Sequence, residues 1–144
     1  MCLHVKTTKP SIAEEDIICY KVIEYSPIDK QYVTPFRNYP MKTGDILHDR
    51  KDWEFDIVEF RTGFFVEAGG FHTYGAKEDA IFFARVLSSS TIVVKCIIPK
   101  GTEYFRGCTT LDDYYVRSYA SKDLKLIEEV DHYDGRDQDE CSEE

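Results

Sequence analysis

The apolar run from Thr91 to Ile98, TIVVKCII, constrains the fold of this chain more than any other stretch. Its length and its β-branched residues are typical of a strand in the middle of a sheet. Pro99, Lys100 and Gly101 follow directly, and they favour a turn because proline restricts φ and glycine permits positive φ. We therefore predict a buried central strand, a tight turn and a short second strand over residues 103–105.

Alternating apolar and polar residues predict further strands elsewhere in the chain. These expected strands cover residues 17–25, 32–36, 53–60, 64–66, 114–119 and 124–130. Ser11 and Glu14 have the spacing of a capping box, so we expect one helical turn over residues 11–16. Residues 37–51 and 107–113 are expected to form irregular loops.

From Ala76 onward the apolar residues recur with a period of 3.6, which is typical of an amphipathic helix. The stripe consists of Ala76, Ala80, Phe83, Ala84 and Leu87. We predict one main helix at about residues 76–87. The fold class that follows is α+β: one strand-rich domain over residues 1–130 with a mainly antiparallel sheet, followed by an acidic, disordered tail over residues 131–144.

The composition excludes several classes of protein. A length of 144 residues with 42% hydrophobic and 14% aromatic residues indicates one folded domain. The net charge of -9 makes nucleic acid an unlikely partner, since a non-specific nucleic-acid binder needs a basic face. Much of that charge lies in the tail, where seven acidic residues accompany Arg136.

The start of the chain and its cysteines suggest where the protein resides. No apolar stretch approaches the ~20 residues that a membrane span requires, and no secretory signal is visible at the start. The sequence contains five cysteines without a Cys-x-x-Cys pair, which predicts free thiols in a reducing compartment. We expect a cytoplasmic protein without a membrane partner, in which Cys19 and Cys96 are buried in strands.

Residues 69–75, GGFHTYG, contain the strongest indication of a binding site. Glycines permit close approach of the backbone, His72 titrates near neutral pH, and a loop that leads into a helix offers free N–H groups to an anion. A phosphate, a nucleotide or a carboxylate would suit such a loop. The alternative is a glycine-rich turn whose histidine is structural. The candidate ligand-binding residues are Tyr20, Gly70, His72 and Tyr74.

No catalytic residue can be assigned from the sequence. The Walker A, GxSxG, HExxH and dinucleotide-binding patterns are absent. The histidines and cysteines do not have the spacing of a zinc site. We expect no metal and no cofactor.

Several segments carry a resemblance to known proteins. They are MCL at the start, IAEEDIICYKV at 12–22, GFHTYGAKEDAIFFA at 70–84, IVVKCIIPKGTEYFRG at 92–107 and SYASKDLKLI at 118–127. Together they resemble a family of short uncharacterised proteins from gut bacteria of the Bacteroides group and their phages. The resemblance covers most of residues 1–130 and implies no particular activity.

The chain is also similar, more distantly, to the ADP-ribosyltransferase-like fold. That similarity implies that Tyr20 takes the place of the first-strand residue that binds the dinucleotide, with His72 or Tyr74 in the central motif beside a helix. In most such enzymes a late strand supplies a catalytic glutamate. The corresponding segment, residues 114–121, contains none, and Glu128 and Glu129 come too late.

Two hypotheses about function follow. The first is a non-catalytic intracellular module that binds an unknown protein or small molecule, since tyrosine is enriched at interfaces and the chain contains ten tyrosines. The alternative is a small nucleotide-binding enzyme of ADP-ribosyltransferase-like type. Whether the protein is an enzyme stays open at this point, and an aromatic face could equally form a homodimer.

Overall fold

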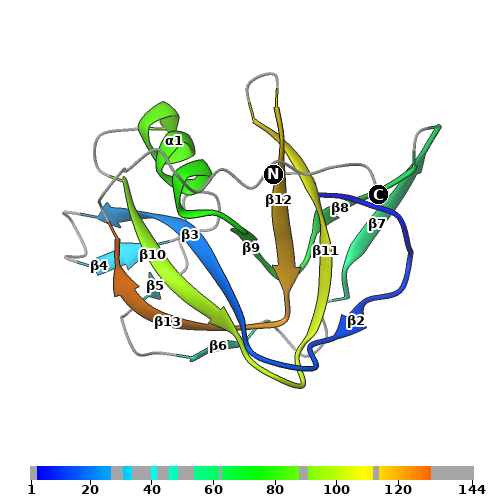
Figure 1. The fold of residues 1–144 in the computed structure, drawn as a ribbon, viewed down its shortest axis with the longest axis horizontal. Helices are drawn as coiled ribbons and strands as arrows, with labels where there is room; N and C mark the ends of the chain where they lie inside the picture. The colour runs from blue at the N-terminus through cyan, green and yellow to red at the C-terminus, as the bar shows by residue number, and fades with distance from the viewer. Residues whose placement is uncertain are drawn as a thin grey trace.

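A strand-rich antiparallel sheet with one helix forms the described part of the molecule (Figure 1). The computed structural model describes residues 3–26, 31–33, 40–41, 46–48, 54–61, 63–87, 91–111 and 114–130. Within these ranges thirteen strands belong to one sheet, and the paired strands are antiparallel. The predicted antiparallel, strand-rich architecture with one main helix is confirmed.

The strands follow an order across the sheet that differs from their order in the chain. Their bounds are β1 Leu3–Val5, β2 Ser11–Ile12, β3 Ile17–Ser26, β4 Gln31–Val33, β5 Pro40–Met41, β6 Ile46–His48, β7 Asp56–Phe60, β8 Gly63–Ala68, β9 Phe71–Tyr74, β10 Thr91–Ile98, β11 Glu103–Leu111, β12 Tyr114–Ser121 and β13 Asp123–Glu129. The sheet order is β6-β13-β10-β3-β9-β12-β11-β1-β8-β7, with β2 beside β11 and β4 beside β3 and β5.

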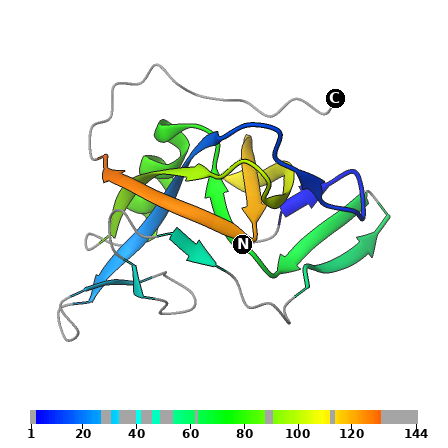
Figure 2. The same ribbon diagram turned by 90° about the horizontal axis from the view of Figure 1, so that it is seen from below.

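Helix α1 (Lys77–Leu87) packs against the adjacent strands β10, β3 and β9 within the sheet. Its first turn carries Glu78 and Asp79 and its last turn Arg85, which suits the helix dipole. The predicted helix at 76–87 is confirmed to within one residue. Figures 1 and 2 show α1 beside β3 and β9, away from the β7–β8 hairpin.

The apolar run that dominates the sequence is the strand β10, with the predicted bounds. It lies between β3 and β13 and pairs with β3 from Thr91↔Glu24 to Ile98↔Ile17. The turn that follows is confirmed, since the Thr102 N–H donates to the Pro99 carbonyl at 3.1 Å. A central position requires apolar residues on both faces, which explains the continuous run.

Two predictions for the following segment are wrong. The strand predicted over 103–105 continues to Leu111, so residues 107–111 are not the expected loop. β11 pairs with β12 from Tyr104↔Ser121 to Leu111↔Tyr114. The physical reason is this long pairing, which supplies hydrogen bonds to residues whose local pattern, with Gly107 and two threonines, is weak.

The predicted helical turn over 11–16 is also wrong. Ser11 and Ile12 form strand β2, which pairs with Glu103 and Tyr104 of β11. The Ala13 N–H donates to the Thr102 carbonyl at 2.9 Å, so sheet contacts take the hydrogen bonds that a helix would need.

The expected loop over 69–75 is largely a strand, which corrects the sequence interpretation. Residues Phe71–Tyr74 form β9, between β3 and β12 in the sheet. Four cross-strand pairs from Ser118↔Tyr74 to Ser121↔Phe71 attach it to β12. The two neighbouring strands explain the difference. They provide hydrogen-bond partners for backbone groups that the glycines had suggested were available to a ligand.

Other predictions fall partly or wholly outside the described residues. These are the strand end at 34–36, position 53, most of the 37–51 loop and the acidic tail at 131–144. Within 37–51 the described pieces are the short strands β5 and β6.

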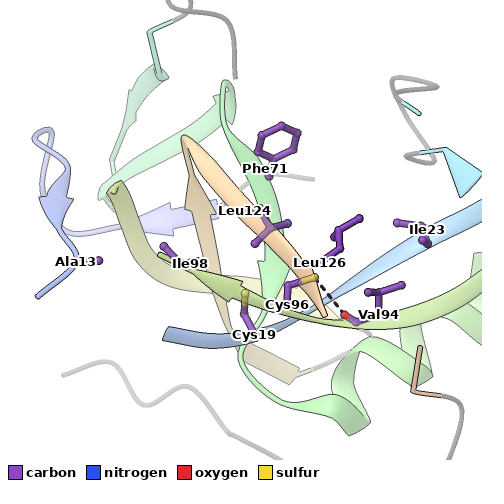
Figure 3. Close-up of a cluster of buried hydrophobic side chains, with 9 residues drawn as sticks. All are labelled: Ala13, Cys19, Ile23, Phe71, Val94, Cys96, Ile98, Leu124 and Leu126. Carbon is purple, nitrogen blue, oxygen red and sulfur yellow. Dashed lines mark hydrogen bonds between the residues drawn. The ribbon is translucent and has the colours of Figure 1, made fainter. Parts of the chain in front are cut away.

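Three clusters of buried apolar side chains form the core. The first lies on β3, β9, β10 and β13 and on the segment between β2 and β3, and it consists of Ala13, Cys19, Ile23, Phe71, Val94, Cys96, Ile98, Leu124 and Leu126 (Figure 3). The second joins α1 to the sheet and consists of Val22, Tyr74, Ala80, Ile81, Ala84, Val93 and Val116. The third consists of Leu3, Val5, Val66, Phe105 and Ala120.

The cysteines agree only in part with the expectation of free thiols. Cys19 and Cys96 are free and buried, as predicted. Cys108 is disulfide-bonded, which corrects the prediction for this residue. Folding can bring together cysteines that are distant in sequence, and their spacing alone does not reveal this. Within the described residues no helix is long and apolar enough to cross a membrane.

Candidate functional site

The structure brings together three of the four residues predicted to bind a ligand. Tyr20 of β3 and Tyr74 of β9 are direct cross-strand partners, so their side chains leave the same face of the sheet. His72 lies two residues before Tyr74 on the same strand and shares this face. Both tyrosines belong to, or pack against, the cluster beneath α1. We call Tyr20, His72 and Tyr74 the aromatic triplet.

Tyr74 is the most deeply placed member of the triplet. It is only 2% exposed, and its ring centroid lies 5.5 Å from that of Phe83 on α1. Its hydroxyl oxygen is buried and has no hydrogen-bond partner among the residues that the structure describes. Burial, together with the charge of Asp79, raises the pKa of Tyr74, so the phenol stays protonated and keeps a donor to offer.

His72 is half-buried and is held through its backbone. The Lys21 ammonium, on a residue that is 8% exposed, donates to the His72 carbonyl at 2.9 Å. Across the other edge of β9, His72 is opposite Ala120 of β12. The imidazole therefore has a small neighbour on that side, while contacts with both adjacent strands set the position of its backbone.

Gly70 is buried and lies just before β9, apart from the aromatic triplet. Its φ is +72°, and a Cβ there would lie 2.7 Å from Phe55 Cε1 and 2.9 Å from the Ser121 carbonyl oxygen. Glycine is thus required where the chain enters β9 between these two residues. Close packing therefore accounts for a glycine at this position. A contact between Gly70 and a ligand stays a prediction.

The sequence interpretation missed two buried acidic residues beside the triplet. Glu78 is 1% exposed and Asp79 is 6% exposed, both in the first turn of α1. The Lys77 ammonium lies 3.8 Å from Glu78 Oε1. Acidic residues in a first turn are normally exposed, so their sequence position gave no sign of burial. The charge of Asp79, which acts on Tyr74, opposes the binding of an anion beside that residue.

The described residues offer no cluster of three His, Cys, Asp or Glu side chains that could hold a metal ion. The chain matches no protein-family model, no curated protein and no solved structure. The resemblances drawn from the sequence stay predictions.

Proposed function

We propose that this chain is a non-catalytic binding module that recognises its ligand or partner at the aromatic triplet. The Tyr74 hydroxyl is the observation that carries the proposal. A buried hydroxyl without a partner lowers the stability of the free protein by about 1–3 kcal/mol. A ligand that accepts a hydrogen bond from Tyr74 would recover this energy. The half-buried side chains of Tyr20 and His72, on the same face, provide further contact.

The charge of Asp79 close to Tyr74 weighs against an anionic ligand at the triplet. Glu78 and Asp79 are buried at the start of α1, and Asp79 is near enough to affect the pKa of Tyr74. A phosphate placed there would meet carboxylates in a region of low dielectric, where like charges repel strongly. The proposed ligand is therefore an uncharged ring, an amide, or the side chain of a partner protein.

A nucleotide-binding enzyme of ADP-ribosyltransferase-like type is the alternative proposal. It is favoured by one observation, the direct pairing of Tyr20 with Tyr74, because the sequence similarity implies that these positions act together. The two buried acids count against a phosphate at the helix start. The absence of a glutamate from β12 counts against catalysis of the usual kind.

A thermal-shift comparison of wild type with Tyr74→Phe and His72→Ala tests the proposal. The probes are adenosine, AMP, NAD and agmatine, which present a neutral ring, two anionic nucleotides and a guanidinium group. A ligand that binds only the native state at a hundredfold excess over Kd stabilises it by about 2.7 kcal/mol. We expect adenosine, whose ring nitrogens can accept a hydrogen bond from the Tyr74 hydroxyl, to raise the unfolding temperature of wild type and not that of Tyr74→Phe.

The other outcomes discriminate between the alternatives. If NAD stabilises the protein and is consumed on incubation, the enzyme reading replaces the binding module. If no probe shifts wild type, and Tyr74→Phe leaves the capture of a purified protein partner unchanged, the triplet is not the recognition site. Phe64→Leu, a change in the third core cluster away from the triplet, is the matched control and should leave every ligand shift intact.

The finer parts of the sequence prediction are retained as proposals. They are the α+β class, a single domain over 1–130, the cytoplasmic location and a homodimer as one form of partnership.

A further inference from the structure

We propose that Cys19 and Cys96 are a reversible oxidation site, a thiol pair that closes into a disulfide across the centre of the sheet. The two residues are direct Cα partners in the β3–β10 ladder. Both are free, and both side chains enter the same core cluster (Figure 3). This inference goes beyond the proposed function and does not depend on it.

The geometry of an antiparallel ladder places such a pair within reach of a bond. Directly opposed residues have Cα atoms about 4.5–5.5 Å apart, and disulfides span Cα separations of about 4.4–6.8 Å. Opposed Cβ atoms lie about 4.5–5.5 Å apart, slightly more than in most disulfides. Closure therefore needs only a small approach of the two side chains and leaves the register unchanged.

The surroundings of the pair contain groups that support thiol chemistry. Burial raises the pKa of Cys19 to about 12, while a hydrogen bond with Thr73 and the charge of Lys21 act in the opposite direction. Burial likewise raises the pKa of Cys96, and Lys21 again opposes it. A buried ammonium beside both thiols stabilises whichever thiolate forms during exchange.

Burial slows the oxidation of the two thiols but does not prevent it. Cys19 and Cys96 are both 0% exposed, so a reagent reaches them only when β3 and β10 separate locally. The oxidation rate should consequently follow the local opening of this ladder. The product, once formed, joins the same two strands and resists further opening.

The reaction is a pair of thiol–disulfide exchanges with a low-molecular-weight disulfide as the oxidant. One cysteine loses its proton to solvent, and its thiolate attacks a sulfur of the reagent, releasing one reagent thiolate. The second cysteine then loses its proton and attacks the protein sulfur of this mixed disulfide, releasing the other. The two cysteines lose two electrons, and the reagent disulfide gains them as it becomes two thiols.

Oxidised glutathione in excess over reduced glutathione is the probe, with peptide mapping without reduction as the readout. We expect a peptide that joins Cys19 to Cys96, lighter by two hydrogen atoms, and its loss on addition of dithiothreitol. The linked form should exceed the mixed disulfides at least about tenfold, because the second step is intramolecular. Far-UV circular dichroism should remain that of the native protein.

Urea at concentrations below the unfolding transition distinguishes a slow oxidation of the two thiols from no oxidation. It raises the population of locally open molecules, so the linked peptide should form faster with the same two cysteines. Cys19→Ala and Cys96→Ala are matched controls, in which the remaining cysteine should give only a mixed disulfide. The proposal is overturned if wild type in urea gives mixed disulfides or unmodified thiols at both positions and no linked peptide.

Discussion

Tyr20 and Tyr74 are opposite each other on neighbouring antiparallel strands, although they are far apart in the chain. Among the described residues, β3 and β9 share one registered pair, and helix α1 begins three residues after Tyr74. The contact therefore joins the sheet, the helix and the candidate recognition surface at one point. Changes to either tyrosine should affect recognition and stability in separable ways.

Tyr74→Phe should raise the free energy of unfolding by about 1–3 kcal/mol, because the hydroxyl removed is buried and has no hydrogen-bond partner among the described residues. Urea denaturation measures this change. Tyr74→Ala is the contrasting variant, since loss of the ring from the cluster with Phe83 should cost about 3–5 kcal/mol. A loss above about 1 kcal/mol in Tyr74→Phe would show that the hydroxyl has a structural partner.

Stability should fall as the pH rises above about 8.5, the ordinary pKa of a thiol in an unfolded chain. Burial raises the pKa of Cys19 to about 12 and also raises that of Cys96. Above pH 8.5 the unfolded state loses these protons while the native state keeps them, so the native state binds more protons and ΔG of unfolding decreases. Each thiol contributes a slope of at most about 1.4 kcal/mol per pH unit, up to the native pKa.

The alkaline effect can be assigned to the thiols by comparing wild type with Cys19→Ala at several pH values in a reducing buffer. The variant has a lower stability at neutral pH because a side chain is lost from the core, but its decline between pH 9 and 11 should be shallower. Equal slopes in the two proteins would show that the pKa of Cys19 is the same in the folded and the unfolded state.

Gly70→Ala should destabilise the protein by about 2–4 kcal/mol, which combines a left-handed backbone with overpacking. The clash is with Phe55 and the Ser121 carbonyl. Gly101→Ala is the matched control, because Gly101 also has positive φ, +90°, but a Cβ there would meet nothing within 4 Å. It should cost only about 1–2 kcal/mol. Thermal unfolding of the two variants measures both changes in stability. Equal losses of stability would contradict the close packing at Gly70.

Asp16→Ala should lower stability by about 0.5–1.5 kcal/mol. The Asp16 carboxylate accepts a hydrogen bond of 2.9 Å from the Lys100 backbone N–H, and this bond holds the turn after β10 against the start of β3. Lys100→Ala should have almost no effect, since its side chain is exposed and the N–H remains. Denaturation curves test both, and a strong effect of Lys100→Ala would give its side chain a role that the turn does not require.

Elements with a strong local signal were predicted well from the sequence. β10 and α1 have bounds that match the prediction because their periodicity and their turn residues agree. The segments at 11–12 and 107–111 were mispredicted, since each is a strand only through pairing with a distant partner. Strand propensity depends on such neighbours more than helix propensity does.

The candidate site was predictable only in its residue types. The pattern around His72 indicated a site near Tyr20 and Tyr74, but it suggested a loop open to an anion. Tertiary structure instead made this segment a strand between two others and buried Glu78 and Asp79 beside it. Burial of a charge in the first turn of a helix depends on what covers that turn, and no local pattern shows this.

The sequence by itself determined the class of elements in this chain, with a central strand, one amphipathic helix and a predominance of sheet. Those properties follow from residue periodicity within one segment. Tertiary structure decided which segments pair, and so placed Tyr20 opposite Tyr74 and Cys19 opposite Cys96. The register between distant strands results from the packing of whole sheet faces against one another. It cannot be predicted from the pattern within a single segment.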